Sequence, residues 1–152
     1  MASNCVFCNN DFAEYSIKQY DYWDVQLFRD DQYYLGRVVI VLKNRHIEDI
    51  FEITMEERTE LFENVIPSIK GSLDTVFEPD LYNYTSLGND CRHVHIHLIP
   101  RYKTTRTFND QRFEDEYWNQ TYAKNTDQRT LNNETYHKLI SILAKNIPKT
   151  PQ

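Results

Sequence analysis

The sequence is poor in the residues that several common kinds of site require. Only three glycines occur among 152 residues. A glycine-rich phosphate loop is therefore excluded, and phosphate would have to be held by side chains and a few backbone amides. No apolar run is long enough to span a membrane, and no secretory or lipidation signal is present. We therefore expect a soluble, cytoplasmic protein with no membrane partner.

Positive charge is also scarce. Seventeen Lys and Arg against 23 Asp and Glu give a net charge of -6, so the overall balance does not favour a nucleic-acid partner. Any phosphate site must then be local. A solvated charged edge explains the individual basic residues equally well. The basic residues that could supply such a site are Lys43, Arg45, Arg92, Arg101, Lys103 and Arg106.

Histidines and aliphatic residues alternate strictly over residues 93–98, which read His-Val-His-Ile-His-Leu. This period, with its β-branched residues, predicts a half-buried strand rather than a helix. On a strand the three imidazoles would share one face, and the aliphatic side chains would share the other and pack on a second layer. One face would build the core and the other would carry chemistry.

Three imidazoles on one strand face allow few kinds of chemistry. Neighbouring same-face positions lie roughly 6.6 Å apart, so one metal ion could take two of them but a third only with distortion. The alternative is that one imidazole attacks while its neighbours bind or orient. Imidazole suits this role because it is largely neutral near pH 7 and its two nitrogens can divide the work.

Residues 93–101, His-Val-His-Ile-His-Leu-Ile-Pro-Arg, resemble the histidine-triad motif of the HIT superfamily of nucleotide hydrolases and transferases. The resemblance implies that His95 is the nucleophile and that His97 hydrogen-bonds the phosphoryl oxygens. It also implies that the backbone near His93 holds His95 in the attacking tautomer, that no catalytic metal is required, and that the chain forms a homodimer.

The three cysteines are an odd number and include the pair Cys5-Val6-Phe7-Cys8, which favours reduced thiols or a metal over a disulfide scaffold. A Cys-x-x-Cys pair can be a zinc half-site, a redox pair or two small core residues. Many bacterial HIT proteins are similar, and that resemblance implies a zinc site of Cys5, Cys8, His46 and His93. Such a site would be structural, because four protein ligands leave no open position for water.

The sequence departs from the family pattern at two places. Arg37 stands where many relatives have histidine, and it would either contact phosphate as a fixed cation or only shape the pocket. Asp90 stands where relatives carry a Ser or Thr that can donate to the leaving group. Asn83 resembles a nucleotide-facing asparagine of the family, and Asn89 could supply a further hydrogen bond.

Local patterns predict the remaining elements. Strands are expected at residues 23–29, 37–42 and 81–87, the first two as an antiparallel pair. Thr54 and Glu57 form a capping box that predicts a helix start, and apolar residues recur every four positions from Leu61 to Phe77. Pro67 should kink or shift that helix, because it lacks an N–H donor. A second amphipathic helix should end before Pro148.

The predicted fold is α+β, with an antiparallel sheet of about five strands, a long helix on one face and a C-terminal helix. Residues 1–102 would form the HIT core, and residues 103–152 an aromatic-rich extension. The expected activity is hydrolysis of a nucleoside phosphoramidate, dinucleoside polyphosphate or similar small-molecule nucleotide through a nucleotidyl-histidine. The alternatives are a nucleotidyltransferase or phosphorylase of the same superfamily, and a binding module whose catalysis has decayed.

Overall fold

A computed structural model describes residues 5–9, 12–29, 31–122 and 129–149. Residues 123–128 and 150–152 of the expected extension lie outside the described residues. The strands are β1 (Ser16–Gln19), β2 (Trp23–Leu27), β3 (Val38–Leu42), β4 (Leu81–Thr85), β5 (His95–Arg101), β6 (Arg106–Phe108) and β7 (Gln111–Phe113). The helices are α1 (Val6–Asn9), η1 (Ala13–Tyr15), η2 (Ile50–Glu52), α2 (Met55–Thr59), η3 (Glu60–Val65), α3 (Ile66–Phe77) and α4 (Asn133–Lys145).

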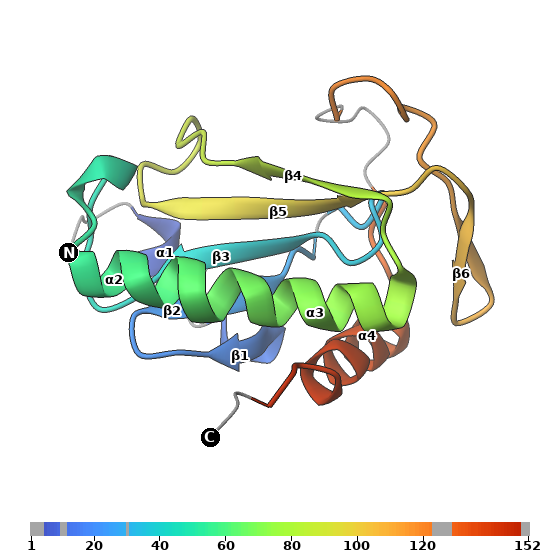
Figure 1. The fold of residues 1–152 in the computed structure, drawn as a ribbon, viewed down its shortest axis with the longest axis horizontal. Helices are drawn as coiled ribbons and strands as arrows, with labels where there is room; N and C mark the ends of the chain where they lie inside the picture. Colours follow the sequence, from blue (N-terminus) through green and yellow to red (C-terminus); the bar gives the residue numbers. More distant parts are fainter. Residues whose placement is uncertain (1–4, 10–11, 30, 123–128, 150–152) are drawn as a thin grey trace.

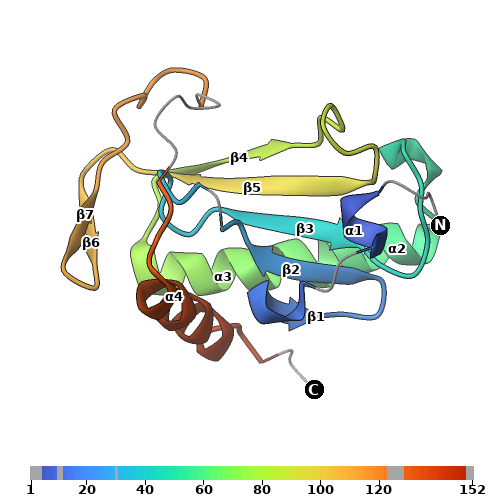
Figure 2. The ribbon, with the colours of Figure 1, turned by 180° about the vertical axis from the view of Figure 1, so that it is seen from behind.

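Five antiparallel strands form the main sheet in the order β1-β2-β3-β5-β4, and β6 and β7 pair as a separate hairpin. The long helix of α2, η3 and α3 covers one face of the sheet, and α1 lies on the opposite face (Figures 1 and 2). The C-terminal helix α4 packs against α3 and β1. The predicted α+β architecture is confirmed. Among the described residues, no helix is long and apolar enough to cross a membrane.

The core lies between the sheet and the long helix. Ile40, Ile96 and Leu98 on the sheet join Leu61 and Leu73 on the helix in one cluster, and each of these side chains is at most 6% exposed. The aliphatic half of the alternating segment therefore builds the core, as predicted. Burying each such side chain contributes about 1.5–3 kcal/mol relative to leaving it exposed.

The long helix begins where the sequence predicts, and its hydrogen-bond pattern shifts just before Pro67. The capping box of Thr54 and Glu57 is present at its start. The predicted shift before Pro67 takes the form of the π-helical segment η3, at whose end the Ile66 N–H donates to the Leu61 carbonyl five residues back. Pro67, which has no N–H to donate, stands directly after this wider turn, in the first turn of α3.

The alternating strand begins later than the pattern suggests. β5 starts at His95, so His93 lies just before the regular strand rather than within it. The backbone of Val94 bonds instead to Leu42 and Ile47, which lie at and beyond the end of β3. The imidazole of His93 still lies near that of His95, because the Phe7 ring contacts both.

A buried ion pair fastens the segment after β5 to the sheet. Arg101 Nε lies 2.6 Å from the Asp115 carboxylate, and the two side chains are 3% and 1% exposed. The same guanidinium donates to the Asn83 side chain and to the carbonyls of Tyr117 and Gln120. One side chain therefore connects β5, β4 and the chain that follows the β6–β7 hairpin.

Replacing Arg101 by Met should lower the free energy of unfolding by about 3–5 kcal/mol, because Asp115 would remain buried without its cation. Urea denaturation measures this loss. The matched control is Arg112→Met, at an exposed position of β7, which should change stability by no more than about 0.5 kcal/mol. A loss of less than about 1 kcal/mol for Arg101→Met would contradict the structural role.

Candidate functional site

His95 and His97 project from the sheet face that the long helix leaves uncovered. In the antiparallel register His95 lies opposite Val41, and His97 lies opposite Val39 on one side and Thr85 on the other. Directly opposed residues share a face, so these side chains lie together, away from the core. The two imidazole centroids are 5.3 Å apart.

A backbone hydrogen bond fixes the tautomer of His95. Its Nδ1 lies 2.6 Å from the carbonyl oxygen of His93, and the His95 side chain is buried. A carbonyl can only accept, so Nδ1 carries the proton and Nε2 of the neutral ring holds a lone pair. This is the hydrogen bond expected from the backbone near His93.

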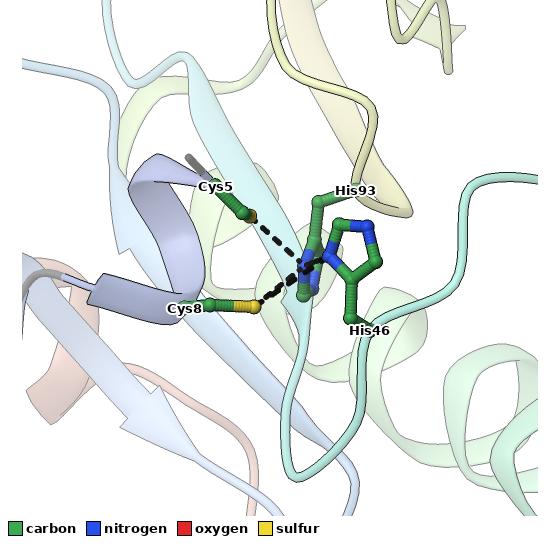
Figure 3. Close-up of side chains that lie close together, drawn as sticks. All are labelled: Cys5, Cys8, His46 and His93. Carbon is green, nitrogen blue, oxygen red and sulfur yellow. Dashed lines mark hydrogen bonds between the residues drawn. The ribbon is translucent and has the colours of Figure 1, made fainter. Parts of the chain in front are cut away.

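Four side chains from three separate segments converge beside this strand. Cys5 precedes α1 and Cys8 lies on it, His46 follows β3, and His93 precedes β5; the side chains point toward one another (Figure 3). Their ligand atoms all lie within 4.8 Å of one another. The sequence separations show that only the folded chain assembles this cluster, which could hold a metal ion.

The spacing of this cluster fits a tetrahedral ion. His46 Nδ1 and His93 Nδ1 are 3.2 Å apart, and the sulfur-to-nitrogen separations are 3.4 Å for Cys5 with His93, 3.5 Å for Cys8 with His93 and 3.6 Å for Cys8 with His46. Zinc bonds of about 2.3 Å to sulfur and 2.0–2.1 Å to nitrogen give tetrahedral edges of about 3.3 Å and 3.5 Å. The donor set and its dimensions therefore suit zinc.

His93 is also prepared as a ligand by its own second nitrogen. Nε2 lies 2.8 Å from the Leu42 carbonyl and donates to it, so Nδ1 presents a lone pair to the cluster. Burial lowers the pKa of His93, which favours the neutral ring that a metal ligand requires.

Arg37 lies beside His97 rather than at the surface. Its Nη2 is 3.4 Å from His97 Nδ1, and its Nη1 is 3.0 Å from the Asp31 carboxylate. The guanidinium carbon lies 4.4 Å from the centroid of the Phe28 ring. Burial lowers the pKa of Arg37, but an arginine remains protonated in proteins. The departure from the family pattern therefore places a buried cation next to the third histidine.

The two asparagines occupy different environments. Asn83 Oδ1 accepts a hydrogen bond of 2.8 Å from Arg101, which fixes the orientation of its amide, and Asn83 shares the face of His97. Asn89 and Asp90 are exposed in the loop between β4 and β5. The structure thus brings Asn83 to the histidine face and leaves Asn89 on a loop beside it.

Several residues of the site were not identified from the sequence. Phe7 packs on His93 and His95 with centroid distances of 5.6 Å and 5.1 Å, and Phe28 contacts His97 edge-on at 5.0 Å. Phe7 lies inside the Cys-x-x-Cys segment, so its place follows once that segment is brought to the triad. Nothing local to Phe28 indicates its contact.

A cavity of about 510 Å³ is lined by Phe7 and Phe28, the two rings that contact His95 and His97. A cavity of this size is typical of small-molecule sites. The position of Gln26 in its polar wall could have been inferred from the sequence. Gln26 alternates with the apolar residues of β2, so its side chain is expected on the face opposite the core, and there it is buried. The residues that line it include Phe7, Phe12, Tyr15, Gln26, Phe28 and Val39.

Comparisons with known proteins agree with this geometry. A solved histidine triad protein from Sinorhizobium meliloti 1021 matches with a TM-score of 0.70 at 18% identity, covering 87% of this chain and 88% of that one. A zinc-bound histidine triad family protein from Mycobacterium smegmatis matches with a TM-score of 0.60 at 17% identity, covering 93% and 94%. At these identities the likeness shows the fold.

The sequence comparisons extend from fold to family. The chain is 31% identical over 107 residues to Protein hit of Bacillus subtilis (strain 168), which covers 66% of this chain and 73% of that protein. The HIT domain family model matches residues 14–104, which include both histidines of β5. The chain therefore belongs to the HIT domain family.

Proposed function

We propose that this protein hydrolyses a nucleotide through a covalent bond between His95 and the α-phosphorus. The observation that carries the proposal is the hydrogen bond from His95 Nδ1 to the His93 carbonyl, which leaves the Nε2 lone pair as the nucleophile. Members of the HIT superfamily are generally nucleotide hydrolases or transferases, and the chain belongs to this family.

The reaction proceeds in two displacements. His95 Nε2 attacks the α-phosphorus, and a P–N bond forms while the bond to the leaving oxygen or nitrogen breaks and its electron pair departs with the leaving group. Water then attacks the same phosphorus and releases a proton to the solvent, the P–N bond breaks, and its electron pair returns to Nε2. The products are a nucleoside monophosphate and the released half of the substrate.

Neighbouring residues would stabilise the phosphoryl group and position the nucleotide. His97 hydrogen-bonds the phosphoryl oxygens, where negative charge develops. Asn83 and Asn89 position the nucleotide, and Arg37 contributes positive charge from behind His97. The cavity beside Phe28 would receive the nucleoside, because its aromatic lining can pack against a base. The substrate class is a phosphoramidate, a dinucleoside polyphosphate or a similar α-phosphate compound.

The cysteine–histidine cluster would hold a structural zinc ion. Zinc would join α1 to His46 and to the beginning of β5 through four protein ligands, which leaves no open position for a reacting water. In the proposed reaction the residues of β5 carry out both displacements without a catalytic metal.

A second copy of the chain would cover the exposed edge at β4. This strand lies at the edge of the sheet, and the apolar side chains of Phe62 and Tyr84 beside it are 60% and 46% exposed. Exposed apolar surface next to an open strand favours a self-complementary two-fold contact. The proposed assembly is a homodimer.

Replacing His95 by Asn should remove the nucleotidyl adduct and lower turnover by at least about a thousandfold, because the nucleophile is lost. Intact-protein mass spectrometry after brief incubation with dinucleoside polyphosphates and with adenosine phosphoramidate detects the adduct. His137→Asn, the same change at an exposed position of α4, is the control and should leave both unchanged. Retained turnover in His95→Asn would exclude His95 as the nucleophile.

The wild-type chain should bind one zinc ion, and Cys8→Ser should lose it because three ligands hold zinc far more weakly than four. Elemental analysis of the purified proteins measures the stoichiometry. Cys91→Ser serves as the control, since Cys91 Sγ lies 3.7 Å from Cys5 Sγ but outside the four-ligand group. A stoichiometric zinc content in Cys8→Ser would refute the assignment.

Replacing Phe62 by Glu should convert the dimer to a monomer, because a carboxylate would be buried at the apolar contact. Light scattering should give twice the chain mass of 18.3 kDa for the wild type and 18.3 kDa for the variant. Ser141→Glu adds the same charge at an exposed position of α4 and should remain dimeric. A monomeric wild type would rule out the homodimer.

A further inference from the structure

Arg37 is a buried cation that the proposed reaction does not by itself explain. Its side chain is 6% exposed, and its partner Asp31 is 5% exposed. The guanidinium lies on the face of the Phe28 ring, and the edge of the same ring contacts His97. Arg37, Phe28 and His97 therefore form one packed group on the histidine face of the sheet.

The stability of the fold gives no reason for this arrangement. A buried ion pair is often no more stable than apolar residues of similar volume, because both charges lose their hydration. Arg37 Nε is buried and has no hydrogen-bond partner among the described residues, and such an unsatisfied donor costs further stability. A costly buried charge in a site is more readily explained by a chemical role.

The contact between Arg37 and His97 has only one favourable protonation pattern. A guanidinium carries five N–H donors and no acceptor. His97 Nδ1, which lies 3.4 Å from Arg37 Nη2, can therefore be attracted only as a lone-pair acceptor. If Nδ1 carried a proton, its N–H would face the N–H of Arg37 Nη2, and two donors repel each other. The single ring proton of neutral His97 must then be on Nε2.

We propose that Arg37 is a positioning residue that holds His97 as the neutral Nε2–H tautomer. Asp31 holds the guanidinium in place from its far side through the 3.0 Å ion pair. The other titratable groups that face this pair among the described residues are His95, whose ring centroid is 5.3 Å from that of His97, Tyr122, whose ring lies 5.9 Å from the guanidinium carbon, and Tyr34, which also interacts electrostatically with Arg37.

The two histidines of β5 would then hold opposite tautomers. His95 donates through Nδ1 to a carbonyl and keeps a lone pair on Nε2, whereas His97 accepts at Nδ1 and carries its proton on Nε2. The first suits attack on phosphorus and the second suits donation to a phosphoryl oxygen. This chemical consequence rests on the proposed function, whereas the tautomer of His97 can be tested without it.

The test is long-range ¹H–¹⁵N correlation spectroscopy on the full chain labelled at histidine, near neutral pH. In the wild type His97 should show a protonated Nε2 and an unprotonated Nδ1. In Arg37→Met it should become a mixture of tautomers, and Arg37→Lys should restore the wild-type pattern, because an ammonium can also donate to Nδ1.

Two controls separate this effect from a general disturbance. Arg129→Met removes another guanidinium that lies on a phenylalanine ring, 3.9 Å from the centroid of Phe113, and should leave His97 unchanged. His95 should remain protonated at Nδ1 in every variant, because its acceptor is backbone. If Arg37→Met does not give a folded spectrum, the double variant Arg37→Met/Asp31→Asn, which leaves no unpaired buried charge, takes its place, and the wild-type spectrum alone already tests the assignment.

A wild-type His97 protonated at Nδ1, or a His97 tautomer that Arg37→Met does not change, would overturn the proposal. Turnover provides an independent readout. With dinucleoside polyphosphates, Arg37→Met should lower kcat by about a hundredfold with a smaller change in KM. If the tautomers are as proposed but the wild type forms no adduct and no product, the proposed function fails while the role of Arg37 stands.

Discussion

His93 makes contacts in three directions, and the histidine site depends on all of them. Its Nδ1 faces the cysteine–histidine cluster, its Nε2–H donates to Leu42 at the end of β3, and its carbonyl accepts from His95. Because one residue makes these contacts, the N-terminal arm, β3 and the proposed nucleophile are fixed relative to one another. In the proposed reaction the cluster would therefore support the site mechanically without touching substrate.

The scarcity of uncompensated positive charge limits the ways in which this site can bind an anion. Five of the arginines near the histidines in sequence or space are paired with carboxylates: Arg37 with Asp31, Arg45 with Glu57, Arg92 with Glu48, Arg101 with Asp115 and Arg106 with Asp80. Their charge is largely compensated within the fold. Neutral donors such as imidazole N–H and amide groups are therefore better placed than free cations to hold a phosphoryl group, and they favour directional recognition over strong long-range attraction.

Local patterns in the sequence were sufficient for most of the fold. The capping box of Thr54 and Glu57, the four-residue period of the long helix and the alternation in β2 and β5 each depend on residues within a few positions. Such patterns report which side of an element is buried. They do not report its partners: the alternation includes His93, but β5 begins at His95, because the Val94 N–H bonds to Ile47, 47 positions away.

The residues of the candidate site could be predicted only where a family resemblance indicated which positions, far apart in sequence, come together in the fold. Cys5, Cys8, His46 and His93 span 88 positions, and no period in the sequence brings them together. The same limit applies to Asp31, which reads as a turn residue but binds Arg37, and to Asp115, which lies in a segment without clear periodicity but binds Arg101. Contacts of this kind can be identified only when the pairing and register of the strands are known.

The hydrogen-bond partners of His95 and His97 differ in how easily a substitution elsewhere in the chain can remove them. The acceptor for His95 is a backbone carbonyl two residues away, which no side-chain substitution removes. The donor to His97 is a side chain 60 positions away, so its chemistry can change with a single residue. The proposed attacking nitrogen is therefore protected by the backbone itself. The proposed phosphoryl donor can be tuned through position 37, where this chain departs from the family pattern.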